Sequence, residues 1–204
     1  MNRETRTDMK RTDMKSRIID AAWKLFREKG YEDTTLDNIL EEAGIAKGSF
    51  YYYFRSKGDL LATWSDILDE KYTELEKELK PEMDSFQKLL FLNGEIHAMI
   101  EDMTSPDLIA SMYAEQLQGK GYRHLLDTNR VYFRLITRII EEGQRRGELT
   151  RDKTVSQLVR AYVMTERAIV TDWCLTGGAY SLSEYSREMM PLLLGFFQRK
   201  ENKA

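Results

Sequence analysis

Several residue types and patterns are scarce in this chain of 204 residues, and each scarcity argues against a class of protein. There are three prolines and twelve glycines, which favours long helices over a turn-rich β architecture. The single cysteine, Cys174, cannot form an internal disulfide, so we expect a reducing, cytoplasmic compartment. No apolar run approaches the roughly 18 residues needed to cross a bilayer, and we expect neither a membrane span nor a signal peptide.

The charge is nearly balanced, with a formal net charge of −3. Up to Leu60 the chain has 12 Lys and Arg against 11 Asp and Glu, whereas the remainder has 19 against 23. This distribution argues against indiscriminate coating of nucleic acid and fits local phosphate contact by the N-terminal part. Hydrophobic residues make up 42% of the chain, which is enough for a packed core and argues against disorder.

Apolar residues recur at helical spacing through almost the whole sequence, and no segment alternates as a strand would. Gly, Pro and cap residues divide the pattern into segments. We therefore predict an all-α fold of about nine helices, over residues 15–29, 36–43, 47–54, 56–79, 84–103, 106–118, 125–146, 154–176 and 183–199.

The segment from Thr35 to Lys57 carries the most specific chemistry. It combines a short amphipathic helix, a turn at Gly44 and a second short helix, and such a corner can project one helix into a DNA major groove. Lys47 and Ser49 occupy the first turn of the second helix, where base contacts are usually made. Gly48 permits close backbone approach, and Lys57 suits a phosphate contact.

Five consecutive aromatic residues, Phe50 to Phe54, follow in the same helix. At about 100° per residue they cannot share one face. We expect Phe50 and Phe54 to be buried, Tyr53 to flank them, and Tyr51 and Tyr52 to face solvent or a partner. The alternative is that the aromatics only hold a small three-helix unit together.

This part of the chain resembles the N-terminal signature of the tetracycline-repressor (TetR) family over about Ile18 to Leu61. The matching residues are Gly30-Tyr31, Thr34-Thr35, Ile39, Ala43-Gly44-Ile45, Lys47-Gly48-Ser49-Phe50-Tyr51, Phe54, Ser56-Lys57 and Leu60-Leu61. The resemblance places Thr35, Lys47, Ser49, Tyr51, Tyr52, Tyr53 and Lys57 at DNA-facing positions, with Thr35, Tyr51 and Lys57 on phosphates.

Two positions depart from the family pattern. Ala46 stands where the family often has a serine that caps the reading helix, and such a cap is worth about 1 kcal/mol. Asp37 lies where the second helix can reach the edge of the groove, and it either accepts from a cytosine amino group or faces water.

The resemblance implies a homodimer that binds a palindromic operator in double-stranded DNA, usually represses, and leaves the DNA when a small-molecule effector binds. Nothing in the residues separates repression from activation. We expect a flexible N-terminal arm over 1–14, which repeats RTDMK in tandem, a helix-turn-helix domain over 15–60 and an effector-binding and dimerisation domain over 61–204.

Effector-pocket candidates are aromatic, methionine and polar residues of the predicted fifth to eighth helices, each of which also suits an ordinary core. They are Phe91, His97, Met103, Met112, Tyr113, Tyr132, Phe133, Tyr162, Met164, Arg167 and Trp173. Arg167 either binds an anionic group or forms a salt bridge. We expect no cofactor.

The last two helices are expected to form the dimer interface, because they carry more apolar surface than a monomer needs. The residues concerned are Leu158, Tyr162, Thr165, Ile169 and Trp173 on one helix and Leu192, Leu193, Phe196 and Phe197 on the other.

Two other classes of function compete with a regulator. For an enzyme, His97, His124 and Cys174 are the obvious nucleophiles or bases, and none has the spacing of a triad or a metal site, so we predict no catalytic and no metal-binding residues. A helical scaffold without DNA binding explains the body equally well but leaves the chemistry of Lys47 to Lys57 unused.

Overall fold

The computed structural model describes the backbone of residues 3–118 and 123–198, and the side chains of 13–118 and 123–198. In these ranges the chain is helical, and its nearest approach to a sheet is an isolated bridge between Leu149 and Gln198. The all-α prediction is therefore confirmed. The helices are α1 (Arg3–Lys29), α2 (Leu36–Ala43), α3 (Lys47–Tyr53), α4 (Lys57–Ala62), α5 (Trp64–Glu78), α6 (Ser85–Met103), α7 (Pro106–Gln118), η1 (His124–Leu126), α8 (Val131–Arg146), α9 (Val155–Leu175), α10 (Leu182–Leu193) and η2 (Gly195–Phe197).

The chain forms two compact units. The N-terminal unit comprises Met1–Trp64 with Asp107–Tyr122, and the C-terminal unit comprises Ser65–Pro106 with Arg123–Ala204. Most of α7 thus belongs to the N-terminal unit, whereas the expected division after residue 60 places α7 in the C-terminal domain.

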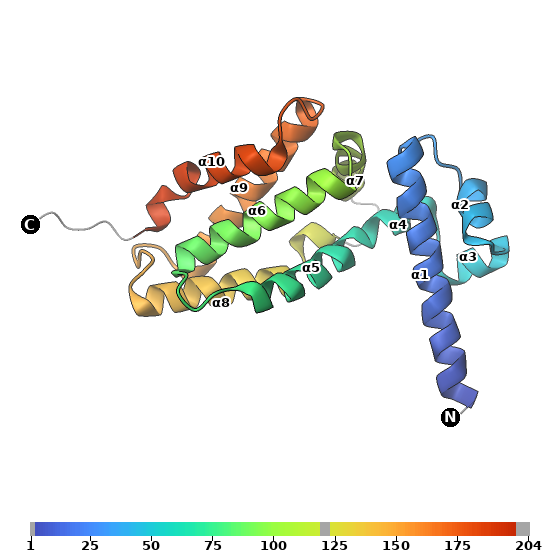
Figure 1. The fold of residues 1–204 in the computed structure, drawn as a ribbon, viewed down its shortest axis with the longest axis horizontal. Coiled ribbons are helices and arrows are strands. Elements are labelled where there is room, and N and C mark those ends of the chain that lie inside the picture. The colour runs from blue at the N-terminus through green and yellow to red at the C-terminus, as the bar shows by residue number, and fades with distance from the viewer. Residues whose placement is uncertain (1–2, 119–122, 199–204) are drawn as a thin grey trace, which may run out of the picture. The chain divides into compact units, whose positions relative to one another are not determined.

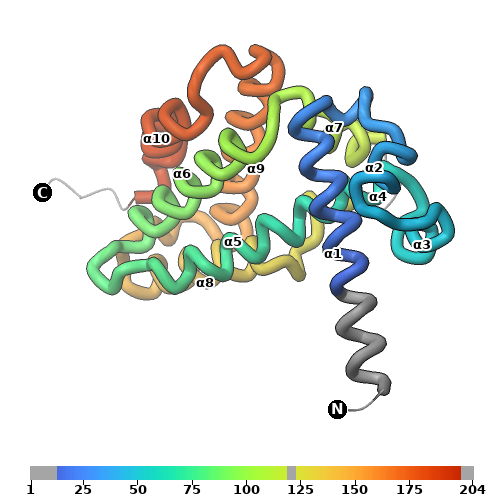
Figure 2. Tube along the Cα trace, turned by 45° about the vertical axis from the view of Figure 1, so that its right-hand side comes forward, coloured from blue at the N-terminus to red at the C-terminus, as the bar shows by residue number. Residues whose placement is uncertain are grey.

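The N-terminal unit is built on α1, with α2 and α3 beside it (Figure 2). Its core holds fully buried Ile18, Ile39 and Phe50 from these three helices. Burying such side chains stabilises the unit by about 1.5–3 kcal/mol each. The N-terminal unit, called the head below, therefore has its own hydrophobic core.

In the C-terminal unit α6 packs against α10 and α8, and α9 packs against α8 and α10 (Figure 1). Leu89, Ile136 and Leu158 lie at its centre with no exposed surface. The isolated bridge near the chain end is completed by a hydrogen bond from Thr150 N to Phe197 O of 2.7 Å.

Four predicted element boundaries were wrong. The expected helix over 183–199 ends at Leu193, and the short 3-10 helix η2 follows it, while residue 199 lies outside the described residues. The expected flexible arm over 1–14 is helical from Arg3, because no Gly or Pro stops α1 from extending upstream. The expected single helix over 56–79 is interrupted at Thr63, whose hydroxyl donates to Leu60 O and accepts from Trp23 Nε1. The expected helix over 125–146 begins only at Val131, after η1 and a turn.

Candidate nucleic-acid interface and effector groove

The corner between α2 and α3 is held by local hydrogen bonds at both ends of α2. Thr35 caps its start, accepting from Asn38 N at 3.2 Å, while Asn38 Oδ1 accepts from Thr35 N at 3.0 Å. Gly44 ends α2 with φ of 62°, a left-handed conformation that favours glycine. This turn sets the direction in which α3 leaves.

One face of α3 is buried and the other is open. Phe50 has no exposed surface and Phe54 has 5%, whereas Tyr51 is 51% and Tyr52 65% exposed. The predicted division of the aromatic run is confirmed. Lys47 and Gly48 are exposed and Ser49 and Tyr53 are half-buried, so the outer face offers an ammonium, a hydroxyl and phenols.

The start of α3 lacks a side-chain cap, as the alanine at position 46 predicts. Ala46 has extended backbone angles (φ −78°, ψ 152°) and makes no capping hydrogen bond. Asp37, on α2, is exposed. The first turn of α3 therefore has no side-chain acceptor for its amide groups, although Ser49 N donates to Ala46 O at 2.9 Å.

Lys57 has a structural role that the sequence did not reveal. Its Nζ donates to Tyr31 O at 2.6 Å and to Thr34 O at 2.9 Å, and it lies 4.0 Å from the centre of the Tyr31 ring. An ammonium has three donors, so one remains for a phosphate. Burial, with smaller contributions from Glu115 and Glu32, raises the pKa of the Tyr31 phenol to about 12 and keeps it neutral.

Three of the predicted pocket residues, His97, Tyr132 and Tyr162, lie in the buried centre of the C-terminal unit. The carboxylate of Glu166 accepts from Tyr132 OH and, at 3.0 Å, from Asn93 Nδ2, and Asn93 connects it to His97. Tyr162 OH donates to Leu89 O at 2.9 Å.

The tautomer of His97 is fixed by a closed ring of hydrogen bonds that joins His97, Ser186 and Asn93. Ser186 Oγ donates to Asn93 Oδ1 at 2.5 Å, so its contact of 2.7 Å with His97 requires Nδ1 of the ring to be the donor. His97 Nε2 is then free to accept from Asn93 Nδ2 at 3.3 Å. Burial lowers the pKa of His97 to about 3, raises that of Glu166, and raises those of Tyr132 and Tyr162 well above the usual value.

The other predicted pocket residues do not gather at this cluster. Phe91 is half-buried on α6, and Met103 lines a separate groove between α5 and α6. Trp173 is buried and donates to Tyr180 O at 3.1 Å. Met112 and Tyr113 lie on α7, in the N-terminal unit.

Phe133 and Arg167 line a groove of about 680 Å³ between α8 and α9, together with the exposed Met164. The sequence reasoning missed three further arginines of this groove, Arg134, Arg138 and Arg160. Their signal was the spacing of Arg134 and Arg138, four residues apart on the face of α8 opposite the apolar stripe.

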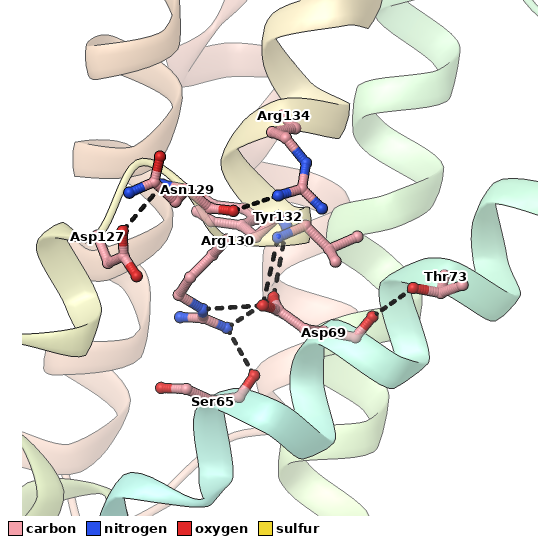
Figure 3. A network of polar contacts seen from close by, with 9 residues as sticks. Ser65, Asp69, Thr73, Asp127, Asn129, Arg130, Tyr132 and Arg134 are labelled. Atoms are coloured by element: carbon pink, nitrogen blue, oxygen red, sulfur yellow. Dashed lines mark hydrogen bonds and ion pairs between the residues drawn. The ribbon is translucent and has the colours of Figure 1, made fainter.

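A clamp at the start of α8 joins it to α5 (Figure 3). Arg130 Nη2 donates to Asp69 Oδ1 at 3.0 Å and to Ser65 O at 2.9 Å. The same carboxylate accepts from Val131 N and Tyr132 N, the first amides of α8. Asp69 therefore balances both a guanidinium and the positive end of a helix.

The residues expected at a dimer interface divide into two groups. Leu158, Tyr162, Ile169, Trp173 and Phe197 are buried within the unit, so this part of the prediction was wrong. The four on α9 form a stripe that faces the core, and Thr165 of the same predicted set is half-buried, with its hydroxyl donating to Ala161 O at 2.9 Å. Leu192, Leu193 and Phe196 are 70%, 44% and 50% exposed, and Met164 and Leu175 on α9 are also exposed.

In ranges 13–118 and 123–198 no group of three or more His, Cys, Asp and Glu side chains is arranged to hold a metal ion. Among the helices described, none is both long and apolar enough to cross a membrane.

Two family models match the chain. Residues 18–63 match the bacterial regulatory proteins of the tetR family, and residues 68–195 match the C-terminal region of YsiA-like proteins of the TetR type. The first model covers the α2–α3 corner, and the second covers the groove and the buried cluster.

Individual relatives are distant over the full length and closer over the head. The fatty acid metabolism regulator protein of Bacillus subtilis is 22% identical over 90% of this chain and 95% of its own. The biofilm operon negative regulator IcaR of Staphylococcus aureus is 57% identical over 44 residues, 22% of this chain and 24% of its own.

Solved structures show the same fold. The transcriptional regulator FadR of Bacillus subtilis, in complex with stearoyl-CoA, has a TM-score of 0.70 at 22% identity and covers 90% of this chain and 99% of its own. Thermus thermophilus FadR, in complex with lauroyl-CoA, has a TM-score of 0.67 at 22% identity over 93% and 97% of the two chains. The chain therefore belongs to the tetR family of bacterial regulatory proteins and is a ligand-responsive, DNA-binding transcriptional repressor.

Proposed function

We propose that this repressor acts in the cytoplasm as a homodimer on a palindromic operator and releases it when a small amphipathic effector binds the C-terminal unit. The observation that carries the DNA-binding half is the open face of α3, with exposed Lys47, Tyr51 and Tyr52 beside the half-buried Ser49. A scaffold function gives this face no role and is not favoured.

The contacts divide by chemistry. Lys47 and Ser49, in the first turn of α3, are suited to base edges, and the methyl group of thymine suits a tyrosine ring. Thr35, Tyr51 and the free donor of Lys57 are suited to phosphate oxygens, and Gly48 leaves room for the backbone to approach. Tyr52 and Tyr53 extend the same surface.

A second copy is needed to read a palindrome. Leu192, Leu193 and Phe196, together with exposed Leu175, supply an apolar surface for it on α9 and the C-terminal segment. Two reading helices then have to match grooves about 34 Å apart. An effector that changes this separation needs about 2.7 kcal/mol of coupling to weaken binding a hundred-fold.

The effector class is supported by the relatives whose solved structures hold stearoyl-CoA and lauroyl-CoA. A long acyl chain with an acidic head group also suits a C-terminal unit whose groove combines apolar residues with arginines. We therefore expect an acyl thioester or a related anionic lipid rather than a cation.

The experiment that tests the proposal begins with selection of bound fragments from genomic DNA. The enriched sequence should be a palindrome, and a mobility shift on it should weaken steeply with salt. Adding dodecanoyl-CoA should release the fragment. Absence of any enriched site, or binding that does not depend on salt, would refute the DNA-binding half.

A further inference from the structure

Two arginines of the α8–α9 groove are held by one short loop. This loop, residues 124–130, contains η1 and the turn that precedes α8. Arg167, on α9, donates to Leu125 O. Arg134, on α8, donates to Asn129 O, as Figure 3 shows. Both guanidinium groups therefore connect the groove to main-chain carbonyls of the same loop.

The lining of the groove combines basic and apolar side chains. Among the described residues Arg160 has no hydrogen-bond or ion-pair partner, while Arg138 is paired with Glu76 of α5. Phe133, Val159 and Val163 supply apolar surface. Glu141 also lines the groove, and it leaves the lining with an excess of positive charge.

A carbonyl oxygen is a weaker partner for a guanidinium than an anion is. A carbonyl oxygen is a neutral acceptor, whereas a carboxylate or a phosphate carries the opposite charge and can bind a guanidinium with two parallel hydrogen bonds. An acidic group that enters the groove is therefore able to displace Leu125 O and Asn129 O.

We propose that the α8–α9 groove is a binding site for an anionic amphiphile, and that Arg134 and Arg167 exchange the loop carbonyls for its acidic head group when it binds. The acyl chain lies over Phe133, Val159 and Val163, and Arg160 adds a further cationic contact. This inference rests on the proposed function and adds to it the site and the first step of the response.

The loop that is released is also the loop that holds α5. Arg130 binds Asp69 and Ser65 O, and Asp69 in turn receives the first amides of α8. Ser65 and Asp69 lie in the first two turns of α5, which follows α4 after Thr63. Loss of the Arg134 and Arg167 bonds therefore removes two contacts of the loop that carries Arg130 and so weakens the support of the clamp on the start of α5.

Calorimetric titration of the full-length protein tests the site. The probes are dodecanoate, dodecanoyl-CoA and, as a cation with the same chain length, dodecyltrimethylammonium. We expect one or both anions to bind and the cation not to bind, with the two anions distinguishing a carboxylate head from a phosphate-bearing one. Arg167→Gln should lower the affinity for the anion at least about ten-fold, which is the effect of losing a charge-assisted hydrogen bond.

Control variants separate this site from the general charge of the protein. Arg145→Gln removes an exposed arginine of α8 that does not line the groove, and it should bind like the wild type. Arg167→Lys keeps the charge without the bidentate geometry, so its affinity for the anion should lie between those of the wild type and Arg167→Gln. Equal affinity of Arg167→Gln, Arg134→Gln and wild type, or preference for the cation, would overturn the site.

Hydrogen exchange tests the release of the loop. Amides of residues 124–130 should exchange faster when dodecanoyl-CoA is added, and they should already exchange faster in ligand-free Arg167→Gln. If the anion releases DNA while these amides stay protected, the inference is wrong and the proposed function stands. If no anion affects DNA binding at all, the ligand half of the proposed function fails. If the groove variants change only the dimerisation constant, the groove is covered by a second copy and the ligand site is refuted.

Discussion

At the scale of single residues, Lys57 shows how one side chain can have two tasks. Its ammonium closes the loop between α1 and α2 by binding Tyr31 O and Thr34 O, and it is also expected at a DNA phosphate. Alanine or methionine at position 57 therefore changes folding as well as binding, and a loss of DNA affinity alone does not identify a phosphate contact.

Lys47 provides the matched comparison, because it is exposed and has no partner among the described residues. We expect Lys57→Met to lower the free energy of unfolding by about 1–3 kcal/mol, the loss of charge-assisted hydrogen bonds, and also to weaken operator binding. Lys47→Met should weaken operator binding with unfolding changed by less than about 0.5 kcal/mol. Denaturant unfolding and mobility shifts on both variants measure this. Equal stability of the two proteins would contradict the role given to Lys57.

His97 makes a second residue-level prediction, concerning pH. The folded protein binds a proton at this ring only near pH 3, whereas an unfolded histidine does so near 6.5. Between these values the unfolded state holds the extra proton, so stability should fall as the pH falls below 6.5, by up to about 1.4 kcal/mol per pH unit. The groups that face the ring are Asn93 and Ser186, with Glu166 beyond Asn93.

Glu166 acts with the opposite sign, because its raised pKa leaves a proton on the folded protein that the unfolded chain releases as the pH rises above about 4.5. Chemical unfolding at pH 5 and pH 6.5 should show a smaller loss on acidification for His97→Gln than for the wild type, and a larger loss for Glu166→Gln. Identical pH slopes for wild type and His97→Gln would mean that the buried ring titrates normally.

At the scale of elements, the periodicity of the apolar residues predicted α2, α3, α6, α7 and α9 to within about two residues. It missed the break at Thr63 because that break depends on a hydrogen bond from Trp23, 40 residues away in sequence. The exposed face of α3 was predictable from five consecutive aromatic residues. Because neighbours in a helix are about 100° apart, five in a row point in all directions and cannot all be buried. Arg167 was among the predicted pocket residues and the spacing of Arg134 and Arg138 was readable, but that Arg134 and Arg167 bind the same loop was not, because these contacts join segments that are brought together only by folding.

A capping residue at the start of α3 should make the protein more stable. Ala46 has the extended backbone angles of a capping residue but no side-chain oxygen. Ala46→Ser should stabilise the head by about 1 kcal/mol and, by ordering the reading helix before DNA binds, tighten operator binding. Thermal unfolding and operator titration measure the two effects, and Ala46→Val, which also lacks a side-chain oxygen and is as poor a cap as alanine, is the control. A serine variant that is no more stable than the wild type would show that the helix start is already satisfied.

At the scale of the whole molecule, the exposed apolar residues near the C-terminal end are the surface that a second copy is expected to cover. Leu192 and Phe196 are 70% and 50% exposed, so replacing both with glutamate should cost the isolated unit little. We expect the double variant to be monomeric in sedimentation equilibrium and to lose most of its affinity for a full palindrome. A dimer of unchanged strength would move the interface elsewhere.

The proposed function depends on binding of DNA by the open face of α3. The most direct measurement is the affinity of wild type, Tyr51→Ala and Tyr52→Ala for the selected operator over a range of salt concentrations, with sedimentation to verify the dimer. Both phenols are largely exposed, so folding should be unchanged. We predict affinity that falls linearly on a logarithmic salt scale for the wild type, and at least about ten-fold weaker binding for Tyr51→Ala with the dimer intact. Unchanged affinity of both folded, dimeric variants would contradict the assignment of the open face of α3 to DNA.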